Sequence, residues 1–120
     1  MKKLIAICCV VFLGIVSSNP ALAKEITLIN PFEVPANKLE ETISFWEKAR
    51  DFLQTQPGYI STSLHQSIAD DARFRLINIA KWESAEAFIA ASKKMQTEAG
   101  LPMVEGLLAS PGLYTVIRED

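Results

Sequence analysis

Apolar and polar positions along this chain change their spacing several times, and each change predicts a new element of secondary structure. A β-branched, apolar run at 26–32 predicts a first strand, and apolar positions three and four residues apart over 39–53 predict a helix. Positions 59–66 alternate between two faces and 74–82 are apolar on both, so two further strands are expected. The remaining predicted elements are a second helix capped by Ser84, one or two helical turns within 103–109 and a last strand at 113–117.

The predicted order of elements is therefore strand, helix, strand, strand, helix, strand. This order predicts an α+β fold of the ferredoxin-like βαββαβ kind, in which a four-stranded antiparallel sheet carries helices on one face. Because the segment 74–82 is apolar on both faces, we expect this strand to be central and covered on both sides. A second copy of the sheet is the simplest cover, which predicts a dimeric α+β barrel.

The first 23 residues stand apart, because they have the parts of an export signal. Lys2 and Lys3 give a positive start, an apolar run follows from Leu4 to Val16, and Ala21-Leu22-Ala23 is a small-x-small cleavage site. A membrane anchor is the competing interpretation, but 13 residues span roughly 20 Å as a helix, against a hydrocarbon core of about 30 Å. We expect a cleaved signal peptide at 1–23, a mature domain at 24–120 and a periplasmic or secreted protein.

Removal of the signal changes the composition of the chain in two ways. Cys8 and Cys9 leave with it, so the mature domain has no thiol for a disulfide, a thiolate metal site or a nucleophile. Lys2 and Lys3 leave as well, which changes 12 basic and 14 acidic residues to 10 and 14, a formal charge of −4. Since no cluster of Lys and Arg remains, we expect no nucleic acid as a partner and no stable membrane attachment.

Four short segments resemble a known family. They are Gln56-Pro57-Gly58-Tyr59, Leu64-His65-Gln66-Ser67, Phe74-Arg75-Leu76-Ile77-Asn78-Ile79-Ala80, and Trp82-Glu83-Ser84 with Phe88. Through them the domain at 24–120 resembles the antibiotic biosynthesis monooxygenase family of small dimeric α+β barrels. The resemblance implies a homodimer that takes a small-molecule substrate or ligand. The family includes oxygenases that oxidise phenolic or quinol-like compounds without a cofactor, relatives that degrade haem, and members with no known reaction.

Two polar residues inside apolar runs are the strongest candidates for chemistry. Asn30 and Asn78 each share a strand face with apolar residues, and their strands are expected to be neighbours. Both amides then open into one cleft beside Trp82, where they hold a substrate phenolate or stabilise an oxygen anion as electrons pass to dioxygen. We assign Asn30, Asn78 and Trp82 as catalytic candidates, and Phe32, Trp46 and Phe88 as substrate-binding candidates. The alternative is structural: the amides satisfy backbone groups, and Trp82 fills the core.

The single histidine of the chain is expected outside this cleft. Alternation at 59–66 predicts one face with Tyr59, Ser61, Ser63 and His65, and a helix-covered face with Ile60, Thr62, Leu64 and Gln66. His65 is therefore expected at the dimer face. The haem-degrading relatives carry a histidine ligand on the second helix, where this chain has Ser92, Lys93 and Lys94. That departure argues against haem chemistry, and we expect neither a metal nor another cofactor.

The sequence therefore predicts an exported, homodimeric oxygenase that acts without a cofactor on a small aromatic or quinol-like compound. The principal alternative is a dimer with the same fold and cleft that binds a small apolar ligand and catalyses nothing. A haem-degrading protein is the third hypothesis.

Overall fold

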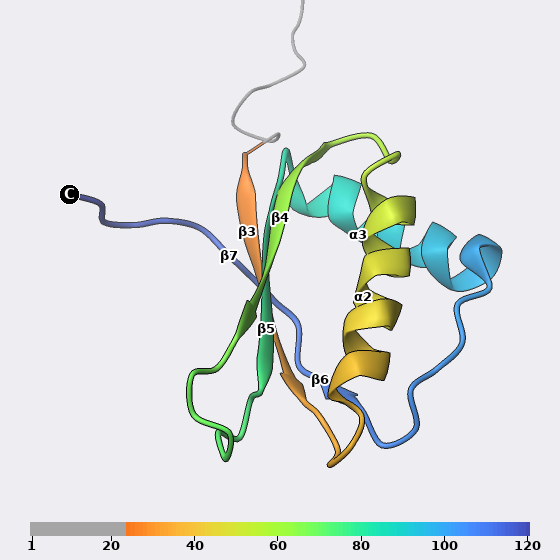
Figure 1. The fold of residues 1–120 in the computed structure, drawn as a ribbon. Helices are drawn as coiled ribbons and strands as arrows, with labels where there is room; N and C mark the ends of the chain where they lie inside the picture. Colours follow the sequence, from red (N-terminus) through yellow and green to blue (C-terminus); the bar gives the residue numbers. More distant parts are fainter. Residues whose placement is uncertain (1–23) are drawn as a thin grey trace, which may run out of the picture.

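The computed structural model describes residues 24–120, so the predicted signal peptide at 1–23 lies outside the described residues. In this part of the chain, five strands form one antiparallel sheet, and two helices lie against one of its faces (Figure 1). The elements are β3 (Ile26–Glu33), α2 (Leu39–Leu53), β4 (Tyr59–Gln66), β5 (Leu76–Trp82), α3 (Ala85–Lys94), η2 (Met95–Ala99), β6 (Leu108–Ala109) and β7 (Gly112–Tyr114). The predicted α+β, ferredoxin-like fold is confirmed. Neither described helix has the length and apolar character needed to cross a bilayer.

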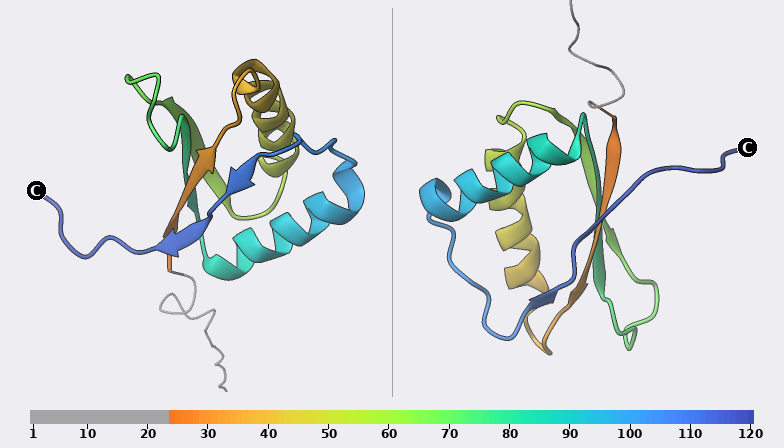
Figure 2. Two further views of the ribbon diagram at one scale, coloured as in Figure 1. Left: turned by 90° about the horizontal axis from the view of Figure 1, so that it is seen from below. Right: turned by 180° about the vertical axis from the view of Figure 1, so that it is seen from behind.

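The strand β5 lies in the middle of the sheet, as its two apolar faces predict. It pairs with β4 on one side and with β3 on the other, in the order β4-β5-β3-β6, and β7 also pairs with β3. The even-numbered side chains of β5 are buried beneath the helices, whereas Ile77, Ile79 and Lys81 are only half-buried on the opposite face. No helix of residues 24–120 covers that opposite face (Figure 2).

A β-bulge in β4 changes which side chains face the helices. Tyr59 pairs with Trp82, and the pairing register shifts by one residue before Ser61, so Ile60 is the extra residue. Tyr59 consequently lies on the helix side, with its ring edge-to-face against Trp82 at a centroid distance of 5.5 Å. Ile60 is exposed instead. The predicted faces of Tyr59 and Ile60 were therefore wrong, because strict alternation contains no sign of a bulge.

The C-terminal part of the chain also differs from the prediction. Helical turns were expected at 103–109, but the chain makes a turn there and continues into the short strand β6. Gly106 has a φ of 84°, and a Cβ on it would lie 2.9 Å from Cγ of Pro35. Only glycine suits this left-handed position against the loop before α2. In place of one strand at 113–117, β6 and β7 each pair with β3, which makes five strands rather than four.

Local signals explain how α3 begins and ends. The Ser84 hydroxyl oxygen accepts a hydrogen bond from the Ala87 N–H at 3.1 Å, which confirms the predicted cap. The helix continues as one π-helical turn, η2, and stops at Gly100, which has a left-handed φ of 59°. Ile89 is exposed. The reason is that Ala91 faces inward, and residues two apart point to nearly opposite sides of a helix.

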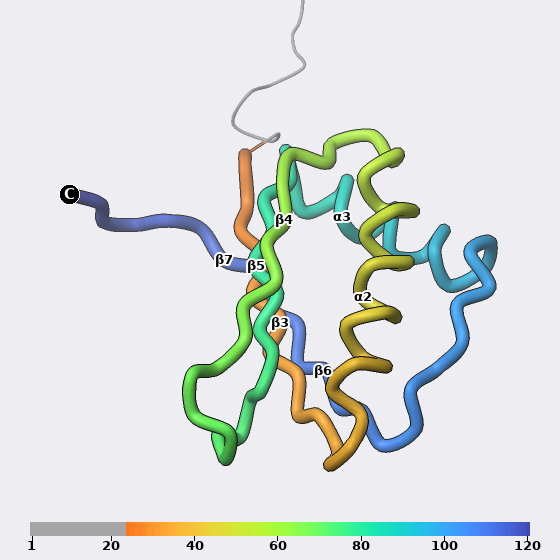
Figure 3. Tube along the Cα trace, viewed as in Figure 1, coloured from red at the N-terminus to blue at the C-terminus, as the bar shows by residue number. Residues whose placement is uncertain are grey.

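The buried core lies at one end of the space between sheet and helices. It consists of Ile26, Leu28, Ala80, Trp82 and Ala91, with Leu53, Tyr59 and Phe88 packed against it. Beyond η2, the chain runs around the other end of α2 to reach β6 (Figure 3). The sheet, the two helices and this C-terminal segment therefore surround a space that the core does not fill.

Candidate functional site

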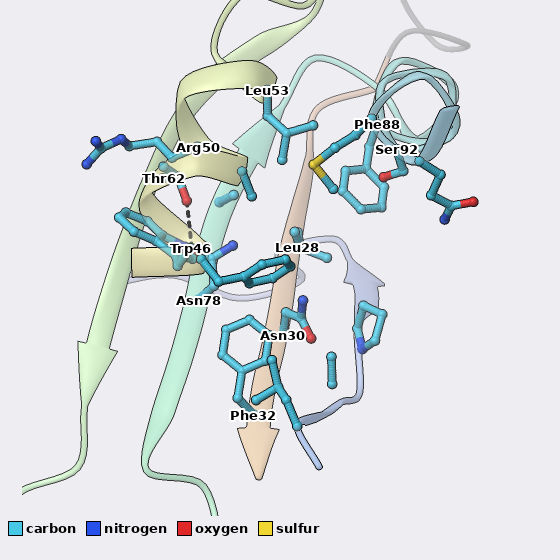
Figure 4. Close-up of a pocket in the computed structure, with 18 of the residues that line it drawn as sticks. Leu28, Asn30, Phe32, Trp46, Arg50, Leu53, Thr62, Asn78, Phe88 and Ser92 are labelled. Carbon is cyan, nitrogen blue, oxygen red and sulfur yellow. Dashed lines mark hydrogen bonds between the residues drawn. The ribbon is translucent and has the colours of Figure 1, made fainter. Parts of the chain in front are cut away.

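A cavity of about 350 Å³ lies between the sheet and the helices (Figure 4). All six residues predicted for the site line it, namely Asn30, Asn78, Trp82, Phe32, Trp46 and Phe88. Asn30 and Phe32 come from β3, and Asn78 and Trp82 come from β5. Trp46 comes from α2 and Phe88 from α3. The remaining wall is mostly apolar, which is the usual composition of a small-molecule site.

Asn78 is the best-held polar group of this cavity. Its side-chain oxygen Oδ1 accepts a hydrogen bond from Trp46 Nε1 at 3.0 Å and another from Thr62 Oγ1 at 2.6 Å (Figure 4). These donors come from α2 and β4, so they fix the amide from two sides. A carboxamide oxygen has two lone pairs, and both are now engaged. The amide nitrogen, which donates no hydrogen bond within residues 24–120, remains as a donor for a ligand.

Asn30 lies directly opposite Asn78 in the pairing of β3 with β5. Side chains that are paired in this way have Cβ atoms about 4.5–5.5 Å apart. The Oδ1 atom of Asn30 is buried and has no hydrogen-bond partner among the described residues. An unpaired buried acceptor costs about 1–3 kcal/mol, so this oxygen is suited to accept a hydrogen bond from a water or a ligand in the cavity. In the described part of the chain, neither asparagine satisfies a backbone group through its side chain, contrary to the structural alternative.

An aromatic wall surrounds the two amides. Trp82 is 1% exposed and makes edge-to-face contacts with Tyr59 at 5.5 Å and with Phe88 at 5.6 Å. The same indole lines the cavity, so its role in the core and a role in ligand binding are compatible. On the α2 side, the Arg50 guanidinium lies 5.2 Å from the centre of the Trp46 ring. This wall offers flat, polarisable surfaces to an aromatic ligand.

Ionisable groups are scarce around the cavity. Arg50 and Tyr59 are the ionisable side chains among the described residues that line it, and no carboxylate or imidazole is among them. His65 pairs with Ile77 and is exposed on the face away from the helices, where the alternation places it. Asp70 is exposed at the hairpin and lies 3.8 Å from Arg75. No group of three metal-ligating side chains occurs within residues 24–120.

Several residues of the cavity were not identified from the sequence. Thr62 was placed on the correct face, but its hydrogen bond to Asn78 has no sequence signal. Phe45, which lies beside the apolar stripe of α2, also lines the cavity. Tyr59 is turned inward by the bulge. Residues of η2 and the C-terminal segment complete the wall: Met95, Gln96, Met103, Val104, Leu107, Ala109 and Pro111.

The fold and the cavity define a small α+β protein with a site for a small, mostly apolar molecule. Residues 25–99 match the family model described as antibiotic biosynthesis monooxygenase. This match covers more than half of the chain, so the chain belongs to the antibiotic biosynthesis monooxygenase family. Among curated proteins, no match was found.

Solved structures give the same assignment. The chain is 52% identical to a "putative monooxygenase" from Shewanella loihica PV-4, with a TM-score of 0.74, over 80% of this chain and 97% of that one. It is 24% identical to SnoaB, a cofactor-independent oxygenase from Streptomyces nogalater, with a TM-score of 0.60, over 81% and 97% of the two chains. The haem degrader MhuD from Mycobacterium tuberculosis, with two haems bound in its active site, is 25% identical, with a TM-score of 0.60, over 79% and 98%.

Proposed function

We propose that this protein is a cofactor-independent oxygenase that acts on a small aromatic or quinol-like compound. The observation that carries the proposal is the arrangement of Asn78, whose oxygen is held by Trp46 and Thr62 while its amide nitrogen remains available to a ligand. A fixed N–H donor in a mostly apolar cavity stabilises an oxygen anion better than water does, because it needs no reorganisation. The neighbouring Asn30 adds a second amide on the same face.

The substrate itself supplies the electrons in this proposal. An electron-rich ring with an acidic C–H or O–H loses a proton to give an anion, whose negative oxygen lies at Asn78. The anion passes electrons to dioxygen and combines with it to form a substrate hydroperoxide. When the carbon that bears this group is a ring CH₂, loss of water leaves a carbonyl. One dioxygen is consumed, one of its atoms enters the product, and the other leaves as water.

Trp82, Phe32, Trp46 and Phe88 position the ring in this scheme. Trp82 lies on the same face of β5 as Asn78, four residues further along the strand, and two aromatic contacts brace it as a rigid part of the cavity wall. Trp46 both contacts the cavity and holds Asn78, which couples ring binding to the orientation of the amide. The flat wall favours a planar ligand over a flexible one of the same volume.

Oxygen consumption by the purified mature protein tests this function. The wild type is expected to consume dioxygen with at least one member of a panel of hydroquinones, anthrones and electron-rich phenols. Asn78→Ala should abolish that uptake, whereas Gln54→Ala, which removes an exposed carboxamide at the end of α2, should leave it unchanged. Uptake that is equal in wild type and Asn78→Ala would contradict the proposal.

A non-catalytic binder of a small apolar ligand is the second candidate. It is favoured by the mostly apolar wall and by the scarcity of ionisable groups that could move a proton. Both tryptophans of the chain line the cavity, so a ligand should quench their fluorescence whether or not it reacts. Quenching by the whole panel without any uptake of dioxygen would select the binder over the oxygenase.

Haem degradation is the weakest of the three candidates. The α3 position that faces the cavity carries Ser92, and the only histidine of the chain, His65, lies on the other face of the sheet. A member of the same fold, MhuD, binds haem, so the test is worthwhile. Titration with haem should give no shifted Soret band, and a stoichiometric band would revive this candidate.

We also propose that the protein is an exported homodimer. The face of the sheet away from the helices carries Ile29, Ile77 and Ile79, and β3 and β5 place Ile29 directly opposite Ile79. A second sheet packed on these side chains would bury them and complete a barrel. Light scattering should give twice the mass of the mature chain. Recovery of a chain that begins at Lys24 from a periplasmic or culture fraction would support export, and a retained Met1 would oppose it.

A further inference from the structure

We propose that Ser92 and Gln96 form a second polar subsite of the cavity, on the helix wall that faces the sheet. The site would then select planar ligands that carry an oxygen substituent at each end, one at the asparagines and one at Ser92 and Gln96. This inference deepens the proposed function and rests on it for the role of the asparagine end. The helix-wall subsite itself is argued from α3 and η2 alone.

The end of α3 and the π-helical turn η2 contribute polar side chains to the cavity wall. Ser92 lies in the last turn of α3, and the consecutive residues Met95 and Gln96 of η2 both line the cavity. A π-turn is wider than an α-turn, and single π-turns are frequent at functional sites. Met95 and Gln96 lie three and four residues after Ser92, so all three share the helix face that borders the cavity, with Ser92 half-buried and Gln96 exposed at its edge.

The charged neighbours of Ser92 point elsewhere. Lys93 and Lys94 line a separate shallow groove on the outer side of α3, together with Gln56 and Thr97. Neither lysine lines the main cavity. Of the polar residues at this place in the chain, Ser92 and Gln96 are therefore the two presented to a ligand, and both are neutral.

The chemistry of these two groups defines what they can recognise. A hydroxyl and a carboxamide each donate and accept hydrogen bonds, so they suit a phenol hydroxyl or a carbonyl rather than a carboxylate. Neither side chain makes a hydrogen bond to another residue within 24–120, so both remain available. Ser92 and Phe88 lie on the helix side of the cavity, and Asn30 and Asn78 lie on the sheet side (Figure 4).

The volume of the cavity limits the size of a ligand that can reach both the asparagines and the helix-wall subsite. At about 350 Å³, it lies near the lower limit of small-molecule sites, which range over about 300–1,000 Å³. Two or three fused rings fit such a volume, and a large macrocycle does not. The ligand class is therefore a compact fused aromatic compound with oxygen at opposite ends.

A pair of unreactive probes tests the subsite without turnover. The probes are 2,6-dihydroxyanthraquinone, with hydroxyls at both ends, and 2-hydroxyanthraquinone, which lacks one of them. Affinity is measured from quenching of the Trp46 and Trp82 fluorescence in the wild type, in the double variant Ser92→Ala/Gln96→Leu, and in Gln54→Leu as a matched exposed control. Thermal unfolding by circular dichroism shows that each variant is folded.

We expect the wild type to bind the two-hydroxyl probe about tenfold more tightly, which is the usual net value of one or two neutral hydrogen bonds. The double variant should lose this preference, and Gln54→Leu should keep it. An unchanged preference in the double variant, no preference in the wild type, or no binding of either probe would each overturn the subsite. Uptake of dioxygen tests the proposed function separately. Selective binding without uptake would support the subsite and contradict the oxygenase function.

Discussion

Trp46 donates its indole N–H to the side-chain oxygen of Asn78 at 3.0 Å, and this hydrogen bond joins α2 to the central strand β5. Thr62 on β4 donates to the same oxygen at 2.6 Å. The Trp46 donor determines how the amide is turned, because an indole N–H can only donate and reversing the amide would place an N–H group against it. The orientation of the amide that defines the site is therefore set by residues 32 and 16 positions away.

Asn78→Asp should separate the catalytic role of this residue from its structural role. A carboxylate still accepts hydrogen bonds from Trp46 and Thr62 but offers no N–H to the ligand. We expect a loss in kcat of about 10²–10³, as is typical when one donor to an oxygen anion is removed. Asn78→Ala should in addition lower the free energy of unfolding by about 1 kcal/mol, because it leaves two half-buried donors without their acceptor.

Steady-state oxygen consumption and urea unfolding measure these two effects. The ordering is the informative result: Asn78→Asp should be more stable than Asn78→Ala and equally inactive. Substantial turnover in Asn78→Asp would show that the amide nitrogen has no part in the reaction.

Asn30→Leu should make the protein more stable and less active. The substitution removes a buried oxygen that has no partner in the described structure and puts an apolar side chain of similar size among apolar neighbours. We expect a gain of about 1–2 kcal/mol in the free energy of unfolding, together with loss of turnover. Gln54→Leu, which replaces an exposed carboxamide outside the cavity, is the control. A destabilised Asn30→Leu would show that the asparagine is satisfied in solution.

Gly58→Ala should destabilise the fold without acting directly on the cavity. Gly58 has a φ of 88°, and a Cβ there would lie 2.5 Å from Cβ of Ala87 on α3. We expect a loss of about 2 kcal/mol or more from strain and the clash together. The double variant Gly58→Ala/Ala87→Gly relieves the clash but keeps the strained φ, so it should recover only part of the loss. Equal stability of Gly58→Ala and wild type would contradict the close approach of this turn to α3.

The pH dependence of the rate should follow the substrate rather than the protein. In the described structure, the cavity wall offers no carboxylate or imidazole to remove a proton, so the substrate must reach the site as an anion or ionise there. The rate should therefore rise with pH through the pKa of each substrate. Two phenols of different acidity should give midpoints separated by the difference of their own pKa values, as initial rates would show. A common midpoint for both would indicate a titrating base on the protein.

Much of the fold and of the candidate site could be predicted from residue patterns in the sequence. The two apolar faces of β5 predict a central strand. Asn30 and Asn78 are recognisable as site candidates because each is a polar residue inside an apolar run, where burial of an amide is costly unless it has a partner. Their pairing follows once β3 and β5 are neighbours. Phe32, Trp46 and Phe88 were expected in the same cleft, and all three line the cavity.

Other parts depend on contacts that no local pattern encodes. The bulge that turns Tyr59 inward depends on how β4 pairs with β5, and Thr62 becomes important only through its bond to Asn78. The course of the C-terminal segment depends on the packing of Gly106 against Pro35, 71 positions earlier in the chain. Such long-range contacts decide the geometry where short-range propensity is weak.

Oxygen labelling tests the central claim most directly. The purified mature protein, free of added cofactor, is incubated under ¹⁸O₂ with the substrate that the panel identifies, and the product is analysed by mass spectrometry. The account predicts one ¹⁸O atom in each product molecule, one dioxygen consumed per product, and no product above background with Asn78→Asp. Product without ¹⁸O, or the same labelled yield from Asn78→Asp, would contradict it.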